Sequence, residues 1–174
     1  YQAYWRSNLV VKTVDYYLQS ADNPNVYEIS TVYSQTYNSP AGSTLNAKDI
    51  AGFTVTSRPS DYPDSSGYRS YNEYIINHYR FYYNRKSFSI QYNYKSEVLK
   101  IEKGILFDAN INSAIYNYRP SRPAGVDDDY TWGGWYSDSG LNQAYSFDKM
   151  PLNDFRLYAK WVAPNMTVSF DLNG

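Results

Sequence analysis

The sequence contains no cysteine, which excludes disulfide bonds, thiol nucleophiles and metal sites built from thiolates. It has a single histidine, His78, and no glycine-flanked serine typical of a nucleophile elbow, so we expect no hydrolytic triad. No apolar run approaches the roughly 20 residues that a membrane span needs. We therefore predict that the protein is not an enzyme, has no catalytic residues and does not insert directly into a membrane.

An excess of charge of one sign is also absent. The 16 basic and 17 acidic residues are interspersed and give a formal net charge of −1, so we expect no nucleic-acid partner. The carboxylates of Asp127, Asp128 and Asp129 could attract Ca²⁺, but consecutive side chains point apart and the spaced loop of a dedicated calcium site is missing. We interpret this run as a solvated turn and His78 as an exposed strand residue, and we predict no metal and no cofactor.

Tyrosine, by contrast, is abundant, with 22 residues in a chain of 174. Aromatic residues followed by a new β-like run recur at residues 1–8, 81–88 and 157–164, a spacing of about 80 residues. The sequence also begins and ends within β-like runs. We therefore expect a fragment of a longer chain, with repeated units that are monomeric within it.

Within each unit the order of local patterns predicts β-β-α-β-β. In the first unit, β runs lie at 9–20, 26–38, 53–59 and 73–83, a helix is predicted at 44–52, and a long polar loop covers 57–74. In the second unit, β runs lie at 87–94, 97–105, 130–137 and 154–161, and a helix is predicted at 106–118. The fold class is α+β and β-rich, with two tandem units divided near residues 84–87, each a mostly antiparallel sheet crossed by one helix.

One series of motifs resembles a known family. The series consists of YTWGGWY at 130–136, SF at 146–147, MP at 150–151 and LYAKW at 157–161. Residues 86–163 are similar in these motifs to the Listeria–Bacteroides repeat, also called the internalin B-repeat. Asp129 and Trp132 depart from the Gly and Phe of the usual pattern. Residues 9–85 resemble divergent, mucin-binding-protein-like units of Gram-positive surface proteins more loosely.

The resemblance implies a ubiquitin-like β-grasp fold for each unit and a place on the bacterial cell surface. Anchoring to the cell wall would depend on regions outside this chain. Residues 1–8 would end a preceding repeat and residues 164–174 would begin a following one. The family has no known catalytic residues to assign here.

The motif YTWGGWY is interpreted as structural, because a thin β core must be filled by a few large rings. With regular pairing, Trp132 and Trp135 would lie on opposite faces, and Gly133 with Gly134 would permit a bulge. The predicted core of the second unit is Phe88, Ile90, Leu99, Ile101, Leu106, Ile111, Ile115, Trp135, Phe147, Leu157 and Trp161.

A binding role is predicted for the loop at 57–74, where tyrosine and arginine alternate with small polar residues, as in recognition loops. The candidate ligand-binding residues are Tyr62, Tyr68, Arg69, Tyr71 and Tyr74, with Arg80 and Tyr82 on the adjoining strand. The favoured function is an adhesin segment that binds a host glycoprotein, a glycan or an immunoglobulin. The alternative is a structural stalk that presents a distal domain. An internal amide crosslink from Lys to Asn or Asp, known in Gram-positive surface domains, stays open because the sequence does not locate one.

Overall fold

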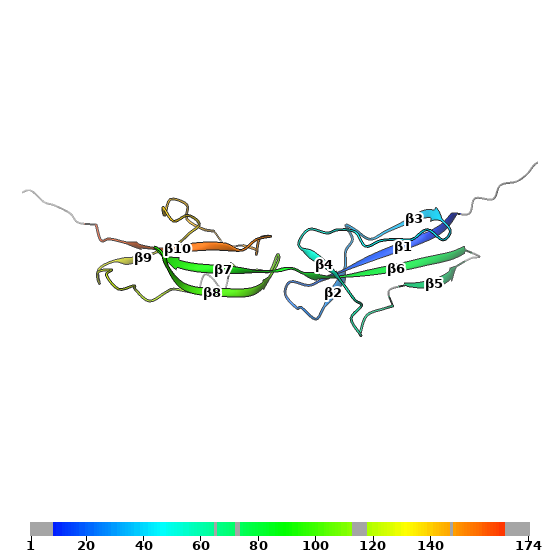
Figure 1. Ribbon diagram of the computed structural model, residues 1–174, viewed down its shortest axis with the longest axis horizontal. Helices are drawn as coiled ribbons and strands as arrows, with labels where there is room; N and C mark the ends of the chain where they lie inside the picture. The colour runs from blue at the N-terminus through cyan, green and yellow to red at the C-terminus, as the bar shows by residue number, and fades with distance from the viewer. Residues whose placement is uncertain (1–8, 65, 72–73, 113–117, 147, 166–174) are drawn as a thin grey trace, which may run out of the picture. The chain divides into compact units, whose positions relative to one another are not determined.

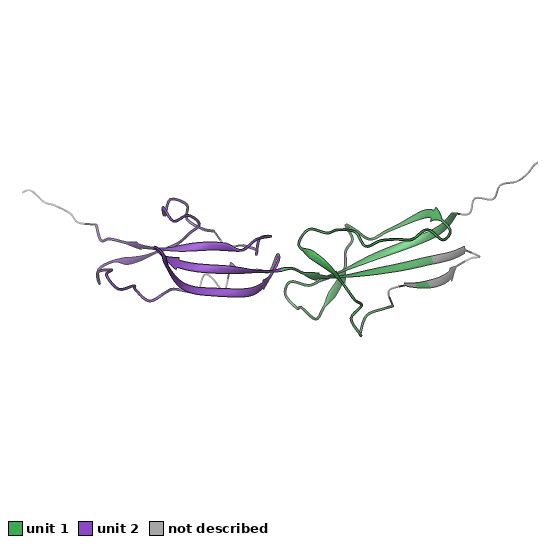
Figure 2. Cartoon of the chain, in the orientation of Figure 1, with its two compact units in different colours: residues 1–86 green, residues 87–174 purple. Residues whose placement is uncertain are grey.

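The computed structural model describes residues 9–64, 66–71, 74–112, 118–146 and 148–165, with the backbone alone for residues 66, 68–71 and 74–76. The chain divides into two compact units, residues 1–86 and 87–174 (Figure 2). The proposed tail of a preceding repeat at 1–8, and most of the proposed following repeat at 164–174, lie outside the described residues. Both units are β-rich, and each contains one mixed sheet.

Unit 1 is a six-stranded sheet with the central order β2-β1-β6-β4 (Figure 1). Its strands are β1 (Leu9–Gln19), β2 (Tyr27–Ile29), β3 (Gln35–Pro40), β4 (Phe53–Thr56), β5 (Ser66–Tyr71) and β6 (Tyr74–Arg85). Strand β3 also pairs with β1, and β5 also pairs with β6. The first and last strands, β1 and β6, are parallel, whereas the other pairs are antiparallel. The sheet is therefore mixed, with its parallel pair at the centre.

The predicted run at 26–38 is divided into β2 and β3 by a turn. The Tyr16 N–H donates to Ser34 Oγ at 3.0 Å, and the Ser30 N–H donates to the Tyr16 carbonyl at 2.8 Å. Between β2 and β3, the turn therefore supplies hydrogen-bond partners for the backbone N–H and carbonyl of Tyr16 on β1. Hydrophobic alternation alone does not reveal such an interruption.

The sheet of unit 1 is covered on both faces, although the alternation of apolar residues at 75, 79, 81 and 83 is typical of a strand with one buried face. Neighbouring residues Tyr82 and Tyr83 are 2% and 1% exposed, although successive side chains of a strand point to opposite faces. The Tyr16 ring lies 5.9 Å from that of Tyr83, and the Tyr17 ring stacks at 4.8 Å on that of Tyr82. Aromatic rings therefore form a core on each side of the β1–β6 pair.

The helix predicted at 44–52 is wrong: residues 43–50 are irregular and lead into a turn before β4. The segment packs through Ile50, which is 3% exposed, and the Tyr83 hydroxyl donates to the Lys48 carbonyl at 2.7 Å. A stretch of nine residues is marginal as a helix, and here tertiary packing supplies the backbone with other partners. Burial of Ile50 therefore does not require helical periodicity.

The loop predicted at 57–74 is also partly wrong. Its second half is β5, which pairs antiparallel with β6 from Ser66↔Tyr79 to Tyr71↔Tyr74. Only the stretch from residue 57 to residue 64 is irregular in the part of this segment that the structure describes. The polar composition concealed a hairpin because a strand that pairs on one side only does not need apolar alternation.

Unit 2 is a four-stranded sheet with the order β8-β7-β10-β9 (Figure 1). Its strands are β7 (Ser87–Tyr94), β8 (Glu97–Leu106), β9 (Thr131–Tyr136) and β10 (Phe155–Val162). Strands β7 and β10 are parallel, and the other two pairs are antiparallel. The helix predicted at 106–118 is wrong for residues 106–111, which form the end of β8, a turn and an isolated bridge from Asn110 to Lys149, and residues 113–117 lie outside the described residues. Unit 2 thus repeats the central parallel pair of unit 1.

The core of unit 2 matches the prediction in part. Ile90, Ile111, Trp135 and Leu157 are buried, and this confirms the prediction for them. Phe88, Leu99, Leu106 and Trp161 are only partly buried. Ile101 is 48% exposed, so its prediction is wrong: it pairs with Gln91 on the sheet face away from the core. Ile115 and Phe147 lie outside the described residues. The core also contains Tyr92, Met150 and Ala159, which the prediction missed.

A bulge in β9 places the tryptophans of YTWGGWY together. The register with β10 shifts so that Lys160 pairs with Gly134 and Trp161 with Trp132, leaving Gly133 unpaired. Gly134 has a φ of 96°, and a Cβ on Gly133 would lie 2.7 Å from Val162 Cγ2. The Trp132 and Trp135 rings are consequently 5.2 Å apart, and the prediction of opposite faces is wrong. The glycines are needed for the backbone conformation and the close approach of β10.

Candidate functional site

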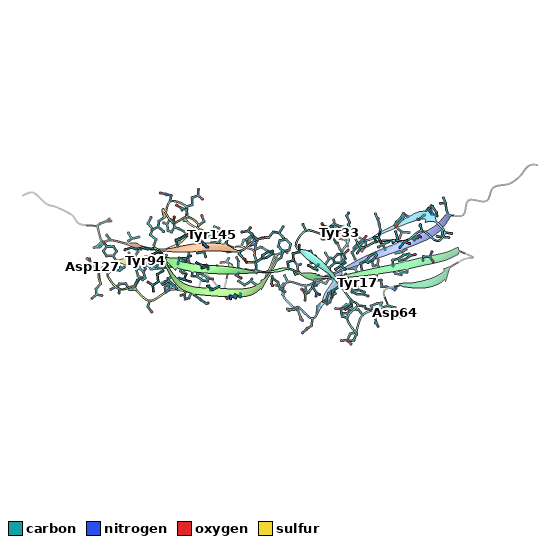
Figure 3. The ribbon with its side chains drawn as sticks, viewed as in Figure 1. Tyr17, Tyr33, Asp64, Tyr94, Asp127 and Tyr145 are labelled. Atoms are coloured by element: carbon teal, nitrogen blue, oxygen red, sulfur yellow. The ribbon has the colours of Figure 1, made fainter. Side chains whose placement is uncertain are left out.

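Four tyrosines gather on one face of unit 1, and we refer to Tyr17, Tyr27, Tyr62 and Tyr82 as the tyrosine cluster. The Tyr62 ring makes edge contacts with the Tyr17, Tyr27 and Tyr82 rings at 6.0, 5.3 and 6.0 Å. Figure 3 labels Tyr17 within this group and Asp64 on the loop that covers it. Strands β1, β2 and β6 and the irregular segment at 57–64 each contribute, so the cluster brings together residues distant in sequence.

Hydrogen bonds attach that segment to the sheet. The Tyr82 hydroxyl donates to the Pro63 carbonyl at 2.5 Å, and the Tyr27 N–H donates to the Tyr62 hydroxyl at 2.6 Å. Arg58 Nη1 donates to the Tyr62 carbonyl at 2.6 Å. Burial raises the pKa of Tyr82, and Tyr17 raises it further; burial and Tyr62 likewise raise the pKa of Tyr27. The phenols therefore serve as neutral packing and hydrogen-bonding groups.

A polar network adjoins the tyrosine cluster on the same face. His78 Nε2 lies 2.5 Å from Asp15 Oδ2, and Arg80 Nη2 donates to His78 Nδ1 at 3.1 Å. Arg80 Nη1 donates to the Asp64 carbonyl at 2.8 Å. With Nδ1 accepting from the guanidinium, His78 carries its proton on Nε2 and donates to Asp15. The histidine side chain is 16% exposed, which corrects its interpretation as an exposed strand residue.

The network has the base and carboxylate of a hydrolytic site, but the described residues show no nucleophile bonded to the base. Among the hydrogen bonds of the described residues, those of His78 join it to Asp15 and Arg80, and none joins it to a hydroxyl. A nucleophile must lie within hydrogen-bond reach of its base. The hydrogen bonds of the polar network hold β1, β6 and the segment at 57–64 together.

The structure separates the predicted binding residues into two groups. Tyr62 and Tyr82 belong to the tyrosine cluster, and Tyr82 is too deeply buried to contact a ligand. Arg80 belongs to the polar network and is partly buried. Tyr68, Arg69, Tyr71 and Tyr74 lie on the β5–β6 hairpin, and their side chains are outside the described part of the structure. The sequence could not distinguish these groups because tyrosine suits a core and a recognition surface equally.

The acidic run in unit 2 lies in the loop before β9, where Figure 3 labels Asp127. Arg122 Nη1 lies 2.5 Å from Asp128 Oδ1 in an exposed ion pair. In the described stretches of the chain, no group of three or more histidine or acidic residues is placed to hold a metal ion. The described residues around the acidic run therefore do not provide the set of oxygen ligands that Ca²⁺ needs.

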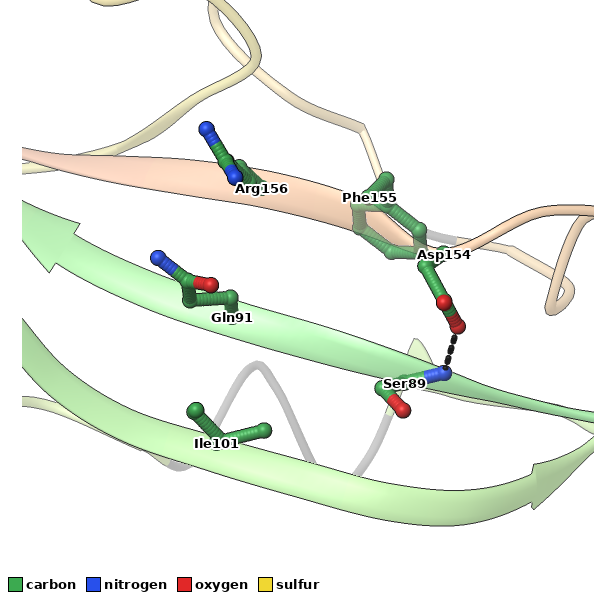
Figure 4. A pocket seen from close by; sticks show the side chains of 6 residues that line it. All are labelled: Ser89, Gln91, Ile101, Asp154, Phe155 and Arg156. Atoms are coloured by element: carbon green, nitrogen blue, oxygen red, sulfur yellow. Dashed lines mark hydrogen bonds between the residues drawn. The ribbon is translucent and has the colours of Figure 1, made fainter.

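A shallow hollow lies on the face of the unit 2 sheet away from the core (Figure 4). It is lined by Ser89, Gln91, Ile101, Asp154, Phe155 and Arg156. Asp154 Oδ1 accepts a hydrogen bond from the Ser89 N–H at 2.6 Å, which fixes the start of β10 against β7. The hollow presents amide, guanidinium and carboxylate groups suited to hydrogen bonding. The alternation of Ser89 and Gln91 with buried residues in β7 was the sequence signal for this polar face, and the prediction did not use it.

Comparisons with known proteins place few constraints on function. No model of a protein family matches the sequence. A protein of Evansella cellulosilytica described as "Putative membrane protein" is 34% identical over 87 residues. The match covers 49% of this chain but only 12% of that protein, so the chain spans a small part of its relative. Within the described residues, no helix is long and apolar enough to cross a membrane.

Proposed function

We propose that both units are variants of the β-grasp fold and form tandem repeats at 9–85 and 86–163. The strand orders β2-β1-β6-β4 and β8-β7-β10-β9 support this proposal, because each unit places its first and last strands in parallel at the centre. The segment between β8 and β9 packs Ile111 into the core, as the crossing segment of a β-grasp unit would. The second unit would then be of the Listeria–Bacteroides type and the first a divergent relative.

We infer that the chain is a non-enzymatic, extracellular spacer of a bacterial cell-surface protein. The observation that carries this inference is the parallel pairing of the first and last strands in each unit. The polypeptide enters unit 1 at the start of β1 and leaves at the end of β6, at opposite ends of one strand pair. Tension along the chain therefore acts in shear across the register pairs from Val11↔Ile76 to Leu18↔Tyr83. Such a unit holds a distal domain away from the cell under load.

The similarity to an Evansella protein described as a membrane protein supports a place at the cell envelope, although the part of that protein shared with this chain is small. Attachment to the cell wall would be provided by other parts of the polypeptide. The tyrosine cluster also supports the spacer function, because its rings pack against one another within unit 1. A spacer needs rigid units more than a binding surface.

Pulling the intact chain by its two ends in a single-molecule force experiment tests the spacer function. We expect unit 2 to extend in one discrete step that releases the length of residues 87–162, since parallel ladder bonds loaded together fail together. Force spectroscopy that shows a gradual extension at low force, with no step from unit 2, would contradict the proposal.

Binding of a host glycoprotein, glycan or immunoglobulin is the second candidate function. The β5–β6 hairpin favours it, because its backbone brings Tyr68, Arg69, Tyr71 and Tyr74 together at one end of unit 1. Strand β5 pairs with β6 alone among the described strands, so β5 lies at an edge of the sheet. In this case the chain would be an adhesin segment, and the spacer geometry would hold the hairpin away from the cell.

Combined replacement of Tyr68, Arg69 and Tyr71 by alanine tests the binding function. If the hairpin binds, two hot-spot residues at roughly 2 kcal/mol each predict a loss of affinity of several hundredfold. The measurement is surface plasmon resonance with immobilised mucin glycoprotein and immunoglobulin G as probes. Val32→Ala is the matched control, because Val32 is 81% exposed in the turn between β2 and β3, outside the hairpin, and its truncation should leave binding unchanged. If the triple variant binds these probes with the same affinity as the parent protein, the hairpin is not the binding site.

A further inference from the structure

A lysine of β1 is enclosed in unit 1 without a carboxylate partner. Lys12 is 1% exposed, and its Nζ donates to the Ser43 carbonyl at 2.5 Å and to Ser43 Oγ at 2.6 Å. The same nitrogen lies 5.6 Å from the centroid of the Tyr79 ring on β6. No aspartate or glutamate of the described chain forms an ion pair with Lys12. Buried lysines are ordinarily paired with a carboxylate, so this one needs another explanation.

An asparagine beside Lys12 also lacks its expected partner. Asn77 is the register partner of Lys12 in the parallel β1–β6 pair. Its side-chain oxygen Oδ1 is buried and has no hydrogen-bond partner among the described residues. Such orphaned oxygens are rare in folded proteins. Two unusual polar groups therefore occupy neighbouring positions on adjacent strands.

The two side chains lie on the same face of neighbouring strands. Register partners on neighbouring strands point to the same face, and the strands are about 4.8 Å apart. The contact between Lys12 Nζ and the Tyr79 ring places the lysine on the face of β6 that Asn77 shares with Tyr79, two residues further along the strand. A lysine side chain with four methylene groups spans the distance between adjacent strands. A bond between the two residues would require a change of rotamer that moves Nζ from Ser43 toward the carboxamide carbon of Asn77.

We propose that Lys12 and Asn77 are joined by an intramolecular amide bond. The lone pair of Nζ attacks Asn77 Cγ, the Nζ–Cγ bond forms and the Cγ–Nδ2 bond breaks. One proton passes from Nζ to Nδ2, which leaves as ammonia. No atom changes oxidation state, and no second reactant is needed.

The product suits its surroundings better than the two separate side chains do. The reaction removes an amine and an NH₂ group from the interior and leaves one amide N–H, so fewer buried donors need hydrogen-bond partners. The bond also joins the first and last strands of unit 1 in a chain that has no cysteine for a disulfide. Its formation depends on the packing of unit 1 and not on the spacer function.

The intact mass of the purified chain tests the proposal directly. We expect the protein to be lighter than its sequence by one molecule of ammonia. Tryptic digestion should yield a cross-linked peptide that contains both Lys12 and Asn77, with no cleavage after Lys12. An intact mass that equals the sequence mass would overturn the proposal, whatever the behaviour of any variant.

Single substitutions identify the two residues of the bond. Lys12→Arg and Asn77→Ala should each restore the full sequence mass, whereas the exposed control Lys86→Arg should keep the deficit of one ammonia. Circular dichroism shows whether each variant folds. If a variant fails to fold, the cross-linked peptide of the parent protein remains decisive. If Lys12→Arg folds and its mass is still lower than the sequence mass by one ammonia, the loss occurs at another site and the proposal is overturned.

Discussion

Replacement of Trp135 by alanine is expected to destabilise unit 2 by about 3–5 kcal/mol, the range found for large buried aromatic residues. Trp135 is 6% exposed, and its ring lies 5.0 Å from the Tyr92 ring and stacks at 5.7 Å on the Tyr118 ring. Its Nε1 donates to the Tyr118 carbonyl at 3.2 Å. Alanine would leave a cavity between the sheet and the segment that covers it. A loss of this size is comparable to the whole stability of a small domain.

Thermal melts followed by circular dichroism and tryptophan fluorescence measure this loss. We expect the transition of unit 2 to fall to much lower temperature, while the transition of unit 1 stays unchanged because the units have separate cores. Val98→Ala on β8 is the matched control: Val98 is 48% exposed, and its truncation should change the free energy of unfolding by less than about 0.5 kcal/mol. A melt of Trp135→Ala that superimposes on the parent's would refute the structural role of the YTWGGWY motif.

Strands with one buried face could be predicted well from the sequence. In β7, Ile90 and Tyr92 alternate with Ser89 and Gln91, and the alternation corresponds to core and open face. In β10, Leu157 and Ala159 alternate in the same way, although neither Tyr92 nor Ala159 was recognised as a core residue. The period of two is a direct consequence of strand geometry, so local sequence is sufficient here.

Segments whose structure depends on distant partners could not be predicted. The stretch at 44–52 has helical spacing, but its conformation follows from burial of Ile50 and from the hydrogen bond that Tyr83 donates to Lys48. The tryptophan positions depend on the bulge in β9, where Val162 and Lys160 of β10 leave no room for a side chain on Gly133. Neither partner can be identified from the local sequence.

The candidate site was predicted least well, for a physical reason. A tyrosine has an apolar ring and a polar tip, so the same residue type fits a core and a recognition surface. Tyr82 follows β6 residues with polar side chains, and only the packing of Tyr17 and Tyr62 against it shows that its face is covered. The polar network was missed because the contact between His78 and Asp15 joins residues 63 positions apart.

The direction of pulling should decide how much force unit 2 withstands. The central claim is that tension is borne in shear by the parallel pair of first and last strands. In unit 2 this pair has four registered positions, from Phe155↔Ile90 to Tyr158↔Asn93. When the strands are pulled from opposite ends, these positions share the load at once. When they are pulled from the same end, the pairs break one after another, and a several-fold lower force is expected.

Because the chain has no cysteine, two engineered cysteines give unique attachment points for this measurement. Lys86→Cys with Ala163→Cys loads the β7–β10 pair from opposite ends, and Ser96→Cys with Ala163→Cys loads it from one end; all three positions are exposed, and unit 1 lies outside the loaded path. Single-molecule force spectroscopy on the two variants should give a several-fold higher unfolding force for the first. Equal forces in the two geometries would contradict the claim that the parallel strand pair carries the load.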